Sequence, residues 1–157
     1  MKNHKLEIKA ALQIRKPVNE VFDAIVEPVK MSNYFISYGS GPLEEGKNVT
    51  WRFPEFDMDV PVRTGRIEKN KYISFFWMSD GLELTVEMNL SERENNSTLV
   101  NVTEKSRDND EAGIKWLMGN TEGWANFLAC LKAYLEYGIN LRKGGFDFMR
   151  TPHSSRP

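Results

Sequence analysis

The sequence predicts an α+β domain in which one long C-terminal helix covers the apolar face of an antiparallel sheet. Three observations lead to this prediction. Residues 6–14 alternate between apolar and polar side chains, which is typical of a half-buried strand. Several β-rich segments with short turns between them follow from residue 49 to residue 105, as in an antiparallel sheet. The last third then changes to a helical period, and its helix is the only predicted element long enough to cover the strands.

The composition fits a single globular domain. The chain has 157 residues, with 21 Lys and Arg against 22 Asp and Glu, so the formal net charge is −1. This balance gives no electrostatic signature of a protein that binds nucleic acid or an anionic membrane surface. The lone cysteine, Cys130, excludes an intrachain disulfide and a Cys-rich zinc site, and we expect it to act as a small hydrophobe. Because no signal peptide or membrane-spanning run is visible, we expect a cytoplasmic protein.

Two short helices are predicted after the first strand. Pro17 ends that strand and is accepted in the first turn of a helix, and apolar residues then recur at helical spacing up to Val26. Pro28 ends this helix because proline disfavours the helical conformation of the residue before it. A second short helix is expected over residues 29–34, and the glycine-rich residues 37–46 are predicted to form a turn.

About five strands are predicted after this turn. Asp80-Gly81 is a strong hairpin signal between two of them, and Asn95-Asn96 marks the turn before the last strand. The predicted strands span residues 49–53, 58–68, 72–78, 82–90 and 98–105.

The final helix is predicted to end at Tyr137, with Gly138 near the expected C-terminal cap. Its start lies near residue 110 or near residue 120, because the sequence at Gly119-Asn120 fits both a continuous helix and a break. We predict a single domain over residues 1–142, followed by a flexible tail over residues 143–157. The apolar stripe of the helix comprises Leu117, Trp124, Phe127, Leu128, Leu131 and Leu135.

Four stretches of the chain carry a more specific signal. They are PVNEVFDAI over residues 17–25, GPLEEGKNVTWRF over 41–53, GRIE and ISFFW within 65–77, and GWANFLACLKAYLE over 123–136. With these motifs the sequence resembles the START-like superfamily and, within it, the family homologous to the activator of Hsp90 ATPase. Tyr34-Phe35 stand where that family usually has a Trp. The resemblance implies a helix-grip fold, in which a curved antiparallel sheet wraps around the long C-terminal helix, often with a cavity between them.

The resemblance also sets the functional expectations. Relatives include proteins that bind lipids, hormones or polyketides, a few that catalyse cyclisation, and an activator of a chaperone ATPase, so fold alone does not choose among them. We expect a non-catalytic module that binds a small apolar or amphipathic molecule between the sheet and the C-terminal helix. The alternative is a protein-interaction module related to Hsp90 ATPase activators. An enzyme of the cyclase or dehydratase type comes third.

Aromatic residues of the strands and of the final helix are the candidate ligand-binding residues. Large aromatic side chains on two opposed elements suit a packed core, and they equally suit the wall of an apolar ligand cavity. An Asn on an apolar helical stripe must find a hydrogen-bond partner if it is buried, whether backbone, water or ligand. The candidate set is Trp51, Phe53, Phe75, Trp77, Trp116, Asn120 and Trp124.

The sequence nominates no catalytic residue, metal ligand or cofactor site. The two histidines, His4 and His153, lie in the terminal segments, and histidine is the commonest general base and imidazole ligand. The acidic cluster of Glu55, Asp57 and Asp59 is expected on a solvated loop face. We therefore expect a small-molecule partner, with a protein partner as the alternative, and the oligomeric state stays open.

Overall fold

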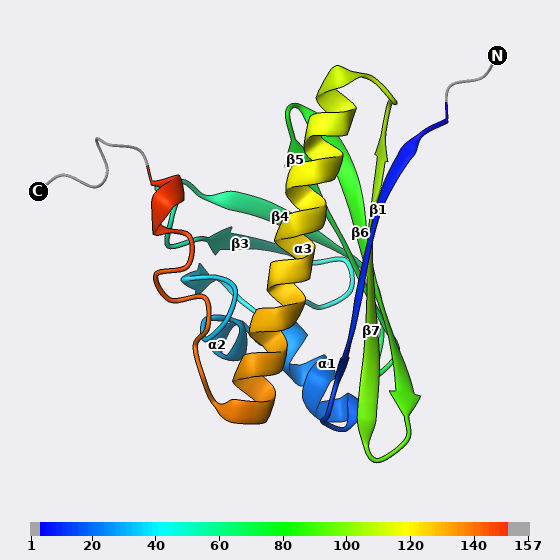
Figure 1. Cartoon of the computed structure of the whole chain (residues 1–157), viewed down its shortest axis with the longest axis vertical. Helices are drawn as coiled ribbons and strands as arrows, with labels where there is room; N and C mark the ends of the chain where they lie inside the picture. Colours follow the sequence, from blue (N-terminus) through cyan, green and yellow to red (C-terminus); the bar gives the residue numbers. More distant parts are fainter. Residues whose placement is uncertain (1–3, 151–157) are drawn as a thin grey trace, which may run out of the picture.

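A curved antiparallel sheet packed against one long helix makes up the fold (Figure 1). The computed structural model describes residues 4–150. The helices are α1 (Val18–Val26), α2 (Pro28–Met31), α3 (Glu111–Tyr137) and the short 3-10 helix η1 (Asp147–Met149). The strands are β1 (Leu6–Ile14), β2 (Tyr38–Gly39), β3 (Asn48–Arg52), β4 (Val60–Glu68), β5 (Tyr72–Ser79), β6 (Leu82–Arg93) and β7 (Ser97–Arg107).

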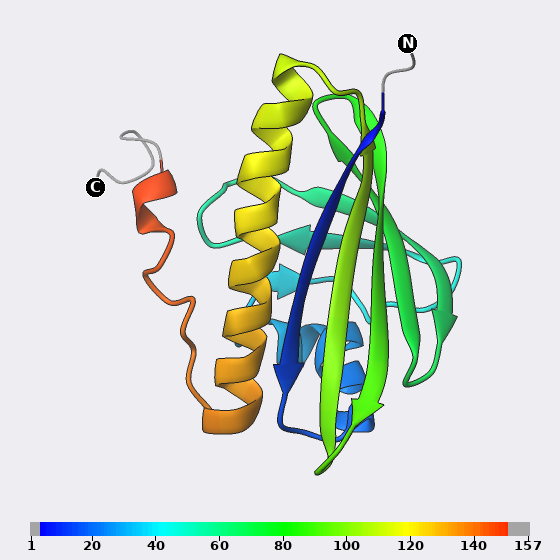
Figure 2. The ribbon, with the colours of Figure 1, turned by 45° about the vertical axis from the view of Figure 1, so that its right-hand side comes forward.

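All seven strands belong to one sheet, with the spatial order β1-β7-β6-β5-β4-β3-β2 and antiparallel neighbours throughout. The first strand along the chain therefore pairs with the last one. α3 lies across the concave face of this sheet, and the two views agree on its course (Figure 2). This arrangement confirms the predicted α+β helix-grip fold. None of the helices within residues 4–150 is long and apolar enough to cross a lipid bilayer.

The predicted element bounds need three corrections. The segment over residues 37–46 is not only a turn, because Tyr38 and Gly39 pair with β3 as the short strand β2. The second helix ends at Met31, and residues 32–35 continue as turns. The strand expected from residue 58 begins only at Val60. In each case the boundary lies in a turn-rich segment, where local sequence patterns are short.

α3 is one unbroken helix, which settles the alternative at Gly119-Asn120. At its start the Asp110 carboxylate accepts a hydrogen bond from the Gly113 amide at 2.8 Å, which satisfies a free N–H of the first turn. At its end Gly138 adopts a left-handed conformation with φ 66°, as predicted for the C-terminal cap. The helix therefore starts at the earlier of the two expected positions.

The core lies between the concave face of the sheet and α3. Alternate residues of β7 point into it, and Val100 and Val102 are fully buried. Leu131 of α3 belongs to the same core cluster and is also fully buried. One inward position of β7 carries a charge, because Glu104 is 0% exposed in phase with the two valines.

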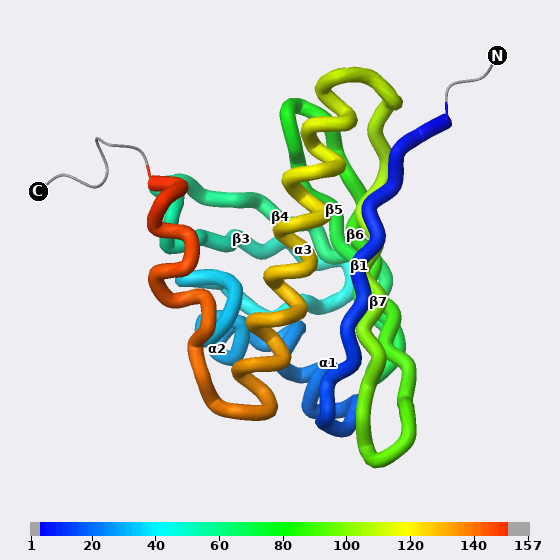
Figure 3. The backbone as a smooth tube through the Cα atoms, in the orientation of Figure 1, coloured from blue at the N-terminus to red at the C-terminus, as the bar shows by residue number. Residues whose placement is uncertain are grey.

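After Gly138 the chain turns back and runs beside α3 (Figures 2 and 3). Arg142 of this segment forms an ion pair with Glu55, with 2.6 Å between Nη2 and Oε1. Glu55 is buried, which corrects the expectation of a solvated loop carboxylate, whereas Asp57 and Asp59 are exposed. The predicted flexible tail over residues 143–157 stays a prediction. Its last part, residues 151–157 with His153, lies outside the described residues.

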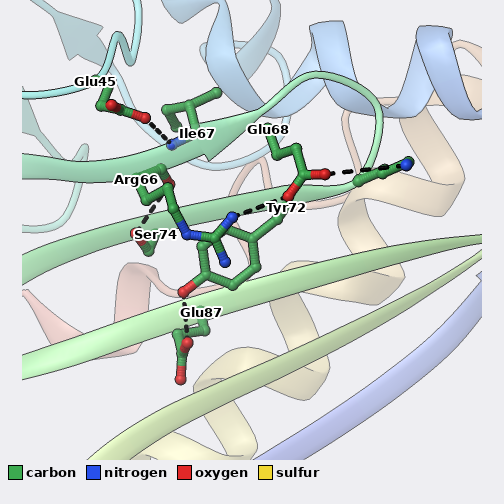
Figure 4. Close-up of polar contacts among 8 residues, drawn as sticks. Glu45, Arg66, Ile67, Glu68, Tyr72, Ser74 and Glu87 are labelled. Atoms are coloured by element: carbon green, nitrogen blue, oxygen red, sulfur yellow. Dashed lines mark hydrogen bonds and ion pairs between the residues drawn. The ribbon is translucent and has the colours of Figure 1, made fainter.

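The outer face of the sheet carries a polar network (Figure 4). The hydroxyl group of Tyr72 on β5 donates a hydrogen bond to the carboxylate of Glu87 on β6. This carboxylate also forms an ion pair with Lys105, at 3.1 Å. These contacts lower the pKa of Glu87, with the Tyr72 hydrogen bond as the main cause. The Arg66 guanidinium lies 4.1 Å from the centroid of the Tyr72 ring and pairs with Glu68. The network links β4 to β7 on the side opposite α3.

Candidate ligand-binding site

The buried carboxylate of Glu104 organises the candidate site. Its Oε1 atom accepts hydrogen bonds from the Trp124 indole nitrogen at 2.8 Å and from Asn120 Nδ2 at 3.1 Å. Its Oε2 atom accepts a hydrogen bond from the Trp77 indole nitrogen at 2.8 Å. All three partners are N–H donors, which suits an ionised carboxylate because that group only accepts hydrogen bonds.

The local structure explains why these four side chains converge. Strand alternation on β7 turns Glu104 toward α3. Asn120 and Trp124 lie four residues apart on α3, and this spacing places them on the same face of the helix, one turn apart. Trp77 reaches the carboxylate from β5, which is separated from β7 only by β6. The site therefore forms between the first half of α3 and the strands β5 and β7.

The charge of Glu104 is not balanced by a basic side chain within residues 4–150. The basic residues next to it on β7 are paired elsewhere, Lys105 with Glu87 at 3.1 Å and Arg107 with Asp80 at 3.0 Å. A buried carboxylate without a cation is costly, and the three N–H donors reduce that cost. A net negative charge remains behind the tryptophan rings.

A pocket of about 320 Å³ lies beside this cluster, between the sheet, α3 and the C-terminal segment. Phe35 and Phe53 form one aromatic pair at its wall, with 5.2 Å between ring centroids. Trp77 and Trp124 form a second pair, at 5.6 Å. Its size falls at the lower end of the range of about 300–1,000 Å³ that is usual for small-molecule sites.

The structure divides the predicted candidate residues into two groups. Trp51 and Phe75 lie behind the pocket in the core, 1% and 0% exposed. Trp116 is also buried and lies nearer the start of α3, with its ring centroid 6.0 Å from the Arg107 guanidinium. The candidates that line the pocket are Phe53, Trp77, Asn120 and Trp124.

Sequence reasoning missed three residues that shape the site. Glu104 carried a usable signal, because it follows Val100 and Val102 in the same strand phase and is therefore placed on the core face. Phe35 was noted only as a departure from the family motif. Arg142 lies at the boundary of the predicted tail, and no periodic pattern marks it.

Two further kinds of site are relevant to the described part of the chain: a nucleophilic cysteine and a metal site. Burial raises the pKa of the Cys130 thiol, which keeps it in the unreactive protonated form. Residues 4–150 contain no group of three or more His, Cys, Asp or Glu side chains that could hold a metal ion.

Comparison with known proteins adds to this geometry. A family model described as activator of Hsp90 ATPase homolog 1-like protein matches residues 15–136. No curated protein matches the sequence. Among solved structures, protein SSP2350 from Staphylococcus saprophyticus is 34% identical, with a TM-score of 0.75, and the match covers 87% of this chain and 96% of that chain.

Two more distant structures share the fold. The Aha1 dimer from Colwellia psychrerythraea is 18% identical, with a TM-score of 0.73 and coverage of 85% of this chain and 98% of that chain. DynU16, described as a putative protein in the dynemicin biosynthetic locus, is 21% identical, with a TM-score of 0.75. That match covers 85% of this chain and 48% of DynU16. At these identities the likeness concerns the fold alone.

Proposed function

The chain belongs to the activator of Hsp90 ATPase homolog 1-like family, and from this premise we propose that it binds a small apolar or amphipathic molecule in the pocket between sheet and α3. The observation that carries the proposal is the make-up of the pocket wall. Five aromatic side chains surround a space into which α3 contributes one amide side chain, Asn120. An apolar concave site with few polar groups is the usual form of a small-molecule site.

Two glycines of α3 support the proposal because they keep the pocket open. Gly119 and Gly123 both line it, and a Cβ atom built on either would meet nothing within 4 Å. A glycine inside a helix is less favourable than alanine by about 1 kcal/mol. The helix thus gives up stability at two positions where a side chain would occupy the pocket.

The C-terminal segment forms the outer wall of the pocket. Arg142 is fixed there by its ion pair with buried Glu55, and its guanidinium lies 4.5 Å from the Phe146 ring centroid. Phe146 also lines the pocket. A second hollow of about 390 Å³ lies on the other side of Arg142, but polar and charged residues dominate its lining. The aromatic pocket is therefore the better site for an apolar ligand.

Titration with the neutral hydrophobic dye N-phenyl-1-naphthylamine tests the proposal. We expect a saturable rise in dye fluorescence and a higher melting temperature, because a ligand that binds only the folded state stabilises it by mass action. Gly123→Leu should fill the pocket with a leucine side chain. Because the dye then loses apolar contacts with the pocket wall, its affinity should fall by about tenfold or more. Ala125→Leu is the matched control, since it adds the same side chain at an exposed position of α3.

Absence of saturable dye binding to the unmodified protein would contradict the proposal. Equal dye affinity in Gly123→Leu and Ala125→Leu would contradict it as well, because the dye would then bind elsewhere. The protein-interaction module and the cyclase-like or dehydratase-like enzyme stay as alternative predictions.

A further inference from the structure

We infer that the pocket selects ligands that carry a protonated amine, and that the ammonium group binds at Asn120. This inference rests on the proposed function and specifies the chemical class of its ligand. Three features of the pocket wall lead to it: the orientation of one amide, the charge behind it, and the aromatic surface around it.

The orientation of the Asn120 amide is set by Glu104. Its Nδ2 atom donates to Glu104 Oε1 at 3.1 Å. A carboxylate has no proton to donate, so the flipped amide would place two acceptor oxygens against each other. Within residues 4–150 the carbonyl oxygen of Asn120 has no hydrogen-bond partner, although the residue lines the pocket. A ligand that donates a hydrogen bond satisfies this oxygen, and one that only accepts does not.

The charge of Glu104 favours a cationic donor over a neutral one. The carboxylate is 0% exposed and lies directly behind Asn120 and the two tryptophan side chains that bind it. In an apolar surrounding its field is poorly screened, so it attracts a positive group in the pocket and repels a carboxylate. An ammonium group at Asn120 would supply the positive charge that the described residues do not provide.

The rings add a third reason. The indole N–H groups of Trp77 and Trp124 are both occupied by Glu104, so these side chains offer a ligand only aromatic carbon surface. Phe35 and Phe53 line the same pocket, but the Arg142 guanidinium already lies 5.8 Å from each of their ring centroids, so the two tryptophans are the rings that a ligand cation would contact. Aromatic rings attract ammonium groups through their negative faces, and tryptophan does so most strongly.

Arg142 does not oppose this selection. It is the one basic side chain among the pocket-lining residues, but its charge is neutralised by Glu55 at 2.6 Å. Both side chains of this pair are largely buried, 13% and 4% exposed.

The test compares three ligands that share one carbon skeleton: 4-phenylbutylamine, 4-phenylbutan-1-ol and 4-phenylbutanoic acid. Isothermal titration calorimetry at pH 7 gives their affinities. The amine is protonated at this pH because alkylamines have pKa values of about 10. We expect the amine to bind about tenfold or more tightly than the acid, with the alcohol between them. Asn120→Leu should reduce the affinity for the amine about tenfold and make the affinities for the three ligands more nearly equal.

Asn126→Leu is the matched control, because it makes the same change on a half-buried α3 residue outside this pocket. It should leave the three affinities unchanged. Glu104→Gln should reduce the preference for the amine over the alcohol, because it removes the charge with little change of size. If that variant does not fold, Asn120→Leu still decides the question.

The outcomes separate the inference from the proposed function. Binding of the acid as tight as that of the amine, or an amine preference unchanged in Asn120→Leu, overturns the inference alone. Binding of N-phenyl-1-naphthylamine without binding of any phenylbutyl ligand also overturns only the inference. If the unmodified protein binds neither the dye nor any of the three ligands, the proposed function fails with it.

Discussion

Trp77 on β5 and Trp124 on α3 donate hydrogen bonds from their indole N–H groups to the two different oxygens of one buried carboxylate, and each bond is 2.8 Å long. Their ring centroids lie 5.6 Å apart. Glu104 therefore ties the helix to the sheet at the same place where the two rings form the wall of the pocket. The stability of the helix–sheet contact and the shape of the pocket depend on the same three side chains.

Replacing Glu104 should destabilise the fold strongly. In Glu104→Leu three N–H groups lose their acceptor, and the Trp124 donor, which is buried, costs about 1–3 kcal/mol when it is unpaired. The Trp77 and Asn120 donors are half-buried, so we expect the free energy of unfolding in urea to fall by about 2 kcal/mol in total. Glu83→Leu is the control, because Glu83 is an exposed residue of β6 whose ion-pair partner, Arg63, is also exposed. A loss in Glu104→Leu no larger than in this control would show that the buried carboxylate does not stabilise the fold.

The contact between Tyr72 and Glu87 should make stability depend on pH. The pKa of Glu87 is lower in the folded state than in the unfolded state, where it is about 4.3. The contact therefore stabilises the fold above the unfolded-state pKa, and this stabilisation is lost as pH falls through the folded-state pKa. Tyr72→Phe removes the main cause of this shift and should cost about 1 kcal/mol at pH 7. The difference from the unmodified protein should shrink as the solution is acidified toward about pH 3.

Urea unfolding at several pH values measures this effect. Tyr38→Phe, a change at an exposed tyrosine of β2, is the control and should show no such trend. A Tyr72→Phe deficit that stays constant from pH 7 to pH 3 would contradict the assignment to Glu87.

The sequence allowed the fold to be predicted because its patterns are local. Strict alternation marked β6, and the apolar stripe marked the second half of α3. The continuity of α3 at Gly119 could not be decided, because the small helix penalty of one glycine competes with packing that depends on the distant strands. Next to this glycine, Asn120 donates a hydrogen bond to Glu104 across the core, a contact that no local pattern reveals.

The site was only partly predictable for a related reason. Aromatic residues could be nominated by type, but which of them face a pocket depends on the curvature of the sheet and on the path of the chain after Gly138. Glu104 lies on the core face by alternation alone, yet its donors are 27, 16 and 20 residues away along the chain. Arg142 is 87 residues from its partner Glu55, and no local pattern predicts such a pair.

The glycines of α3 should respond to alanine in opposite ways. Gly119→Ala adds a Cβ atom in open space, so it should raise the free energy of unfolding by up to about 1 kcal/mol. Gly113→Ala is the contrasting change, because its Cβ would lie 1.9 Å from the Asp108 carbonyl oxygen. It should destabilise the protein, by about 1–3 kcal/mol for a forced backbone shift. Thermal unfolding of both variants checks the pair, and a loss in Gly119→Ala would mean that the pocket side of the helix is already filled.

Leu131 should behave as a central core residue. It is 0% exposed, in the middle of the apolar stripe of α3. Leu131→Ala should therefore cost about 2–5 kcal/mol, the usual range for a large-to-small change in a packed core. Leu141→Ala makes the same change on a side chain that is 53% exposed and should stay within about 0.5 kcal/mol. Similar urea midpoints for the two variants would place Leu131 outside the core.

The ion pair of Arg142 and Glu55 should couple the C-terminal segment to the rest of the fold. Arg142→Met leaves the Glu55 carboxylate, 4% exposed, without its cation, and Glu55→Gln leaves the largely buried guanidinium without its anion. The two single changes together should therefore lose more free energy of unfolding than the double variant does. We expect a coupling free energy of about 1–3 kcal/mol from the double-mutant cycle in urea.

Arg52 and Asp59 provide the comparison, because they form a pair of the same length, 2.6 Å, with side chains 54% and 57% exposed. Solvent screens this pair, so the cycle on it should give a clearly smaller coupling than the cycle on Arg142 and Glu55. Equal coupling in the two cycles would mean that burial adds nothing to the Arg142 contact. In that case the C-terminal segment would be held to the sheet no more firmly than a surface loop, and the outer wall of the pocket would open readily. A larger coupling for Arg142 means that the same residue that closes the pocket also holds the C-terminal segment, up to residue 150, beside α3.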